Sequence, residues 1–181
     1  LDLNVEHNKL AEAIVVESKI ETGKGSVATV IIKNGTLKEG DHFTCGSAFG
    51  RVRALLDEAG ARVKNAPPGM PVEVLGFDSV PQAGDVMYVM PNEETAKDIT
   101  EKVKEQKKLE NTASVKKSSL EEMMANVSKG AAKKLPIIVK ADVQGSLEAI
   151  VASLEKVGNE EVKINVIHNA IGAINESDVS L

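Results

Sequence analysis

The residues of this chain that could do chemistry include a glycine-rich run, Thr22 to Ser26, that superficially looks like a phosphate-binding loop. Such a loop needs Gly, four further residues and then Gly-Lys followed directly by Ser or Thr at the start of a helix. Here Ser18 stands where the first Gly is required, Gly25 separates Lys24 from Ser26, and a β-branched run follows. The run is therefore interpreted as the turn of a hairpin.

The remaining candidates for chemistry also favour structural roles. Asp142 to Gly145 matches the loose Asp-x-x-Gly of nucleotide switches, but we interpret it as a strand-to-helix connection with Ser146 as the N-cap. The single Cys45 is interpreted as a small buried side chain rather than a nucleophile. The histidines are scattered over segments of different type, at His7, His42 and His168. The sequence therefore predicts no catalytic residue, no cofactor-binding residue and no metal site.

One group of residues points to binding. In Gly50 to Asn65, cations alternate with apolar residues on both sides of a turn at Asp57 to Gly60. Alternation with period two places the apolar side chains inward, namely Val52, Ala54 and Val63, and the cations together on the outer face. The candidate contacts to RNA phosphates are Arg51, Arg53, Arg62 and Lys64. The alternative is a solvated strand face that Asp57 and Glu58 neutralise.

Composition limits what such a patch can do. The chain of 181 residues has a net charge of -5, and residues 1 to 92 hold 9 Lys and Arg against 12 Asp and Glu. Any contact with nucleic acid must therefore be local. A lone Cys and the lack of a long apolar run predict a soluble, cytoplasmic protein with no membrane partner, and we expect a monomer. The chain starts at Leu1 and stops after a fresh helix start, so we expect a piece of a longer protein.

The elements that must position these residues begin with a β-barrel over residues 1 to 92. Short β runs separated by Gly and Pro turns are typical of a small closed antiparallel barrel. Gly23 and Gly25 predict a hairpin between Ala13 to Ile20 and Val27 to Ile32, and the latter run, apolar on both faces, is expected to be buried on both. Three further turns are predicted: a type I′ hairpin turn at Asn34-Gly35, and turns at Gly40-Asp41 and Gly84-Asp85 just before strands.

A helical connector is predicted over residues 93 to 134, and a truncated α/β domain over residues 135 to 181. Asn92 to Glu110 is predicted to form a mostly solvated helix with a thin apolar stripe of Ile99, Val103 and Gln106. A second short helix is expected over 119 to 127. Two parallel strands, Pro136 to Ala141 and Val162 to His168, are expected on either side of a helix from Ser146 to Val157. Another helix starts near Asn175.

Two stretches resemble a known family. GKGSVATVIIKNGTLKEGD, residues 23 to 41, looks like the second, barrel domain of translational GTPases. The run from Leu135 to Val179 resembles the domain that follows the barrel in bacterial translation initiation factor two. The first motif does not separate the initiation factor from elongation factors, whereas the second is specific to the initiation factor.

The resemblance implies a docking and coupling role. The family's whole protein binds GTP and Mg, promotes initiator tRNA binding to the small ribosomal subunit, and promotes subunit joining. By this resemblance the nucleotide motifs lie upstream of Leu1 and the tRNA-binding barrel lies downstream of Leu181. The chain itself is then expected to be non-catalytic, to hold no cofactor, and to meet small-subunit ribosomal RNA through its barrel. The alternatives are the equivalent domains of another translational GTPase, or a stand-alone β-barrel binding module.

Overall fold

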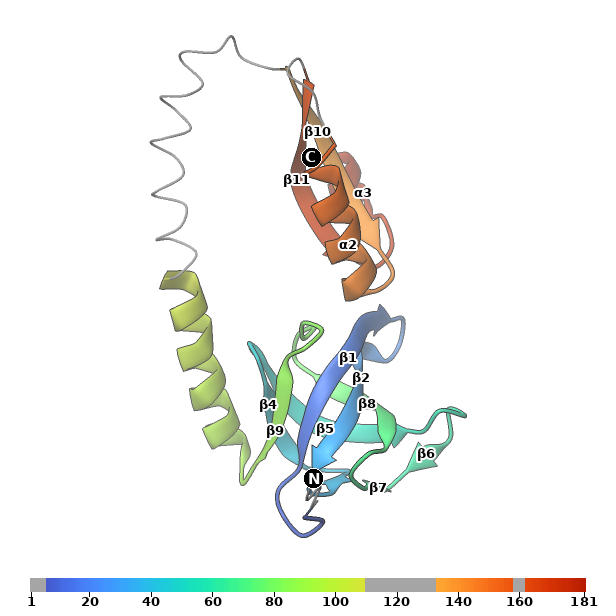
Figure 1. Ribbon diagram of the computed structural model, residues 1–181, viewed down its shortest axis with the longest axis vertical. Helices are drawn as coiled ribbons and strands as arrows, with labels where there is room; N and C mark the ends of the chain where they lie inside the picture. The colour runs from blue at the N-terminus through green and yellow to red at the C-terminus, as the bar shows by residue number, and fades with distance from the viewer. Residues whose placement is uncertain (1–5, 110–132, 158–161) are drawn as a thin grey trace, which may run out of the picture.

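The computed structural model describes residues 6–109, 133–157 and 162–181. Figure 1 shows a β-barrel, a helix along one side of it, and a small α/β unit. This arrangement confirms the predicted fold class. The short helix expected over 119 to 127 lies outside the described residues. The division of the chain into domains at residues 92 and 134 stays a prediction.

Among the described residues, six strands close into an antiparallel barrel. They follow the order β4, β9, β1, β2, β8 and β5, and β5 pairs with β4 to complete the ring. Two short pieces complete this part: β6 (Arg62–Val63) extends the edge of β5, and β3 (Leu37–Lys38) pairs with β7 (Asn65–Ala66). The barrel strands are β1 (Glu12–Glu21), β2 (Gly25–Asn34), β4 (His42–Cys45), β5 (Ala48–Leu56), β8 (Pro71–Phe77) and β9 (Val86–Met90).

The barrel interior is mostly aliphatic, and its two aromatic side chains, Phe43 and Phe77, have ring centroids 4.7 Å apart. Strand β2 gives Ala28, Val30 and Ile32 to this core. On its other face Ile31 is 39% exposed. The prediction that this strand is buried on both faces is therefore wrong beyond Val27, because a barrel encloses only the inner face of its strands.

Of the turns predicted at Gly23 to Gly25 and at Asn34-Gly35, Gly40-Asp41 and Gly84-Asp85, three are confirmed. Gly23 and Gly25 adopt positive φ angles between β1 and β2, and the two Gly-Asp turns precede β4 and β9. The type I′ turn at Asn34-Gly35 is wrong, because only Gly35 has a positive φ and β2 does not pair with β3. A Cβ at position 35 would lie 2.5 Å from the Lys9 carbonyl oxygen, so Gly35 instead permits close approach of the N-terminal segment.

Strand β5 is irregular where it crosses β8. Gly50 pairs with Phe77 and Ala54 with Leu75, so the residues from Arg51 to Arg53 face the single Gly76. Gly76 has a φ of 122°, and a Cβ there would lie 1.9 Å from the Arg51 carbonyl oxygen. The bulge therefore requires glycine at position 76.

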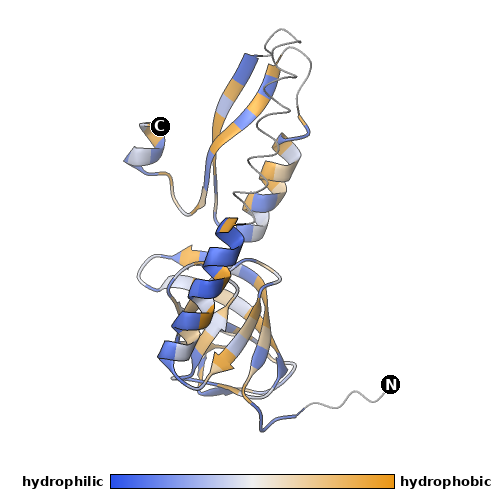
Figure 2. Cartoon of the chain, turned by 90° about the vertical axis from the view of Figure 1, so that its left-hand side faces the viewer, coloured by the Kyte–Doolittle hydropathy of each residue, from blue (hydrophilic) through white to orange (hydrophobic). Residues whose placement is uncertain are grey.

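The connector helix, residues 93–109 of the described chain, packs against β4 and β5. Its buried residues are Ala96 and Thr100, whereas Ile99 of the predicted stripe is 36% exposed. The Thr44 and Thr100 hydroxyl oxygens lie 2.8 Å apart, and Thr100 also donates to the Ala96 carbonyl. Figure 2 shows mostly hydrophilic residues along the outer side of the helix, as expected for a solvated face.

The α/β unit has the predicted parallel pair, β10 (Lys133–Ala141) and β11 (Val162–Ile171), joined through α2 (Gln144–Leu154). Helix α2 begins earlier than predicted: Val143 is its N-cap and makes no side-chain capping bond, so the assignment of Ser146 as the cap is wrong. Helix α3 (Glu176–Val179) begins after Asn175, as predicted. Asp178 lies 2.9 Å from the Lys140 ammonium and so ties α3 to β10.

Replacing Gly76 by alanine should lower the free energy of unfolding of the barrel by about 3 kcal/mol or more, because the positive φ and the clash with Arg51 both oppose a Cβ. Urea unfolding can be followed through Tyr88, the single tyrosine of a chain without tryptophan. Gly60→Ala is the matched control, since Gly60 also has a positive φ but no atom within 4 Å of the new Cβ. Equal losses for the two variants would contradict the close approach.

Thr100→Val should lower the free energy of unfolding by about 1–3 kcal/mol, because the buried Thr44 hydroxyl loses its acceptor. The double variant Thr44→Val with Thr100→Val should recover part of that loss, since neither hydroxyl then remains unpaired. Urea unfolding of both single variants and the double variant measures the coupling. Strictly additive losses would show that the two hydroxyls do not hold the helix on the barrel.

Candidate nucleic-acid interface

The predicted hairpin turn forms between β5 and β6. Leu55 pairs with Val63, and Leu56 with Arg62. The Asp57 carboxylate closes the turn by accepting bonds from the backbone N–H groups of Ala59 and Ala61, each at 2.9 Å. Asp57 therefore serves the turn and is not placed to neutralise the cations.

The alternation predicted on β5 holds only as far as the bulge. Val52 is buried in the barrel core, with Arg51 and Arg53 exposed on either side of it. After the bulge Leu55, rather than Ala54, is the residue that enters the core. The predicted inward position of Ala54 is therefore wrong, because the strict alternation of β5 breaks at the bulge, where three of its residues oppose one residue of β8.

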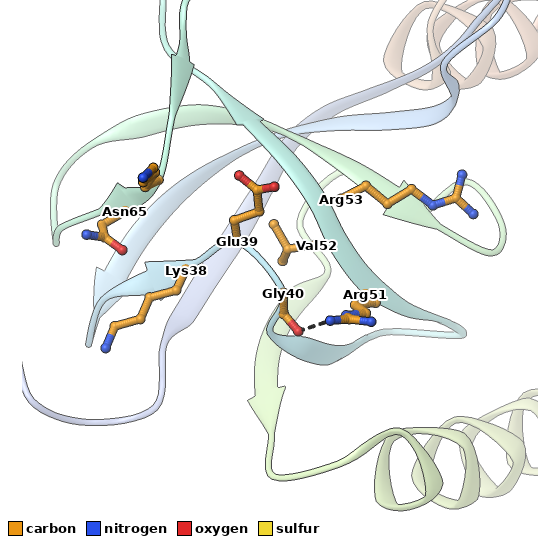
Figure 3. Close-up of a pocket in the computed structure, with 8 residues that line it drawn as sticks. Lys38, Glu39, Gly40, Arg51, Val52, Arg53 and Asn65 are labelled. Carbon is orange, nitrogen blue, oxygen red and sulfur yellow. Dashed lines mark hydrogen bonds between the residues drawn. The ribbon is translucent and has the colours of Figure 1, made fainter.

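Arg51 and Arg53 line an open hollow of about 920 Å³ on the barrel surface. Lys64 and Lys38 line the same hollow, so side chains from β3, β5 and the segment between β6 and β7 converge there. Figure 3 shows Lys38 and Arg53 reaching outward on opposite sides of the hollow, while the Arg51 Nε donates to the Gly40 carbonyl at 3.2 Å. We call this site the cationic hollow; its cations are Lys38, Arg51, Arg53 and Lys64.

Arg62 does not line the hollow. Its guanidinium pairs with the Glu39 carboxylate, with Nε 3.3 Å from Oε2, and Nη2 also donates to the Arg53 carbonyl at 3.2 Å. Of the four predicted contacts, the structure thus gathers Arg51, Arg53 and Lys64 and gives Arg62 a bracing role. Glu39, rather than Asp57 or Glu58, is the carboxylate that pairs with a member of the predicted set.

Lys38 was missed by the sequence reasoning. Residues 37 and 38 pair with residues 66 and 65, which carries Lys38 from a distant part of the chain to Lys64. The local signal was weak: a cation beside the apolar Leu37, in front of the Gly40-Asp41 turn. A two-residue strand pair leaves no periodicity that could predict its partner.

The histidines and the single cysteine do not line the cationic hollow. The three histidines lie on separate elements or loops, and no group of three or more His, Cys, Asp and Glu side chains among the described residues could hold a metal ion. Cys45 is fully buried, and burial, followed by the nearby Asp85 carboxylate, raises the pKa of its thiol to about 12. Such a thiol is a poor nucleophile at neutral pH.

The glycine-rich run does not fit a nucleotide phosphate. Gly23 and Gly25 form the turn between β1 and β2, and the Lys24 ammonium pairs with the Glu21 carboxylate at 2.5 Å. A strand follows the turn, so no helix N-terminus is available there to hold a phosphate. None of the described helices is long and apolar enough to cross a membrane.

Comparisons with known proteins find similarity to translation factors over most of the chain. Residues 10–90 match the family model for elongation factor G domain 2, and residues 109–181 match the model for translation-initiation factor 2. The chain is 50% identical over 180 residues to translation initiation factor IF-2 of Thermoanaerobacter sp. strain X514, covering 99% of this chain and 26% of that protein. It is 48% identical over 181 residues to the IF-2 of Rhodospirillum rubrum, covering 100% of this chain and 21% of that protein.

Among solved structures, GDP-bound aIF5B from Aeropyrum pernix is similar with a TM-score of 0.48 and 25% sequence identity, over 97% of this chain and 28% of that chain. The chain spans about a quarter of the length of the IF-2 of Thermoanaerobacter sp. strain X514.

Cys45 should resist alkylation by iodoacetamide at pH 8 in the folded protein and react fully in urea. A thiol with a pKa of about 12 leaves only about one thiolate in ten thousand at that pH, and burial blocks the reagent as well. Mass spectrometry over a time course measures the rate. Rapid labelling without denaturant would contradict both the buried position and the structural role of Cys45.

Proposed function

Since the chain is homologous to one region of translation initiation factor 2, we propose that it is a docking and coupling region of such a factor. Its barrel binds the RNA of the small ribosomal subunit through the cationic hollow, and the region itself carries out no catalysis. The single observation that carries this proposal is the convergence of Lys38, Arg51, Arg53 and Lys64 on one open hollow of a net acidic barrel.

The hollow suits the phosphates of an RNA backbone. Arginine presents several donors in a planar fork that matches phosphate oxygens, and lysine adds a mobile point charge. The cations are exposed, so binding does not require the removal of deeply buried charges. Such contacts position a protein on RNA without reading its sequence, which suits docking on one fixed place of a large particle.

The remaining activities of the factor belong, in this proposal, to the parts of the longer protein on either side. GTP and Mg bind upstream, and initiator tRNA binds downstream. What this chain adds is a mechanical link. The connector helix packs on β4 and on β5, and β5 is the strand that carries Arg51 and Arg53, so a displacement of the barrel on RNA also displaces the helix.

The triple variant Lys38→Glu, Arg53→Glu and Lys64→Glu should weaken binding of this chain to purified small ribosomal subunits by about ten- to a hundredfold at low salt. These three cations make no side-chain ion pair within the described residues. The slope of log K against log salt should become less negative by about 2 to 3, since each lost phosphate contact removes about 0.7 to 0.9. Cosedimentation across a salt series measures both quantities.

A matched control carries the same change in charge at exposed lysines elsewhere: Lys102→Glu, Lys134→Glu and Lys163→Glu, on the connector helix, β10 and β11. This control should keep the affinity and the salt slope of the unmodified chain within about twofold. Arg62→Glu should have a smaller effect on binding than Arg53→Glu, because Glu39 already pairs with Arg62. Equal binding by the triple variant and the unmodified chain at every salt concentration would refute the docking role.

A further inference from the structure

A second, smaller hollow of about 220 Å³ lies beside the cationic hollow and shares Arg51 and Arg53 with it. Its floor is the place where β5 crosses β8, with Gly50 and Gly76 at the crossing. A Cβ at Gly50 would lie 2.2 Å from the Gly76 carbonyl oxygen, so the two backbones leave no room for side chains there. The hollow is therefore built into the bulge and does not result from a loosely placed loop.

Two carboxylates, Asp78 and Glu93, also line this second hollow, and both are already engaged. Asp78 accepts from the Phe49 backbone N–H at 2.8 Å and lies 3.5 Å from the Lys104 ammonium. Glu93 lies 2.6 Å from the Lys97 ammonium. That ammonium is the main cause of a lowered pKa of Glu93, with smaller contributions from His42 and Arg51. Neither carboxylate forms a close ion pair with Arg51 or Arg53, because the ion-pair partners of Glu93 and Asp78 are Lys97 and Lys104.

His42, at the start of β4, supplies the third polar group. Its Nδ1 is buried and has no hydrogen-bond partner among the described residues. A proton on Nδ1 would remain unpaired there, which favours the tautomer with the proton on Nε2. His42 lines the second hollow, and on this tautomer its ring donor is the Nε2–H.

We propose that the bound RNA strand continues from the cationic hollow across β5 into the second hollow, where Arg51, Arg53 and the His42 Nε2–H hold a further phosphate. The inference rests on the proposed function and extends it: the RNA path runs across the barrel toward the start of the connector helix. Glu93, at that start, is an unfavourable charge along this path, and so is Asp78.

Substitutions of His42 test the path through hydrogen bonding. His42→Leu should weaken binding to purified small ribosomal subunits about fivefold, whereas His42→Gln, which keeps an N–H donor near the position of Nε2, should stay within about twofold of the unmodified chain. Urea unfolding followed through Tyr88 shows whether each variant is folded. Equal binding by folded His42→Leu and the unmodified chain would overturn the inference.

Glu93→Gln tests the path independently, because Glu93 is exposed and its replacement should leave the fold intact. It should tighten binding about two- to fivefold at low salt, and the gain should disappear at high salt. Glu105→Gln, further along the same helix and exposed, is the matched control and should change nothing. A gain of the same size in both variants would show only a general charge effect and would also overturn the inference.

These outcomes separate the two proposals. If the triple variant of the cationic hollow loses binding but the His42 and Glu93 variants behave like the unmodified chain, the docking function stands and the extended path is wrong. If the triple variant also binds normally, both proposals fail.

Discussion

Strand β5 has to pair with β8 on one edge and with β4 on the other, and the barrel closes only if both pairings form. Both pairings can form because Gly50 closely approaches the Gly76 carbonyl at a bulge, where three residues of β5 face one residue of β8. A bulge of this kind increases the local twist and redirects the side chains on the bulged strand. Closure of the barrel and the direction of Arg51 and Arg53 therefore depend on the same pair of glycines.

The electrostatics of the surface follow from this geometry. The barrel segment is acidic overall, so the cationic hollow exists only because pairing of β3 with β7 brings Lys38 and Lys64 beside the bulged strand. Glu39 also lines the hollow, but its carboxylate pairs with Arg62. An excess of positive charge thus stands on a small part of an acidic protein, where it attracts phosphates at short range and falls off within about a Debye length of 10 Å.

The sequence was sufficient for features encoded by neighbouring residues. The β1–β2 hairpin, the Gly-Asp turns and the parallel pair of the α/β unit all follow from local turn chemistry or periodicity. It was insufficient where a distant backbone decides the outcome. Gly35 serves the approach of the N-terminal segment, and the bulge moves Ala54 out of register. Lys38 joins the site through a strand pair too short to leave a pattern, and the buried stripe of the connector helix includes a polar residue, Thr100.

That polar residue shows how the barrel and the connector helix become one unit. A strongly apolar helix would be needed if hydrophobic burial alone held it, and this helix has few apolar side chains to bury. Instead the Thr44 and Thr100 hydroxyls bond across the interface, and the Lys97 and Lys104 ammonium groups lie 5.7 Å and 5.8 Å from the Phe49 ring centroid. Phe49 precedes Gly50 on β5. The helix is therefore anchored on the strand segment that leads into the bulge, which would carry the proposed phosphate binding at Arg51 to the orientation of the helix.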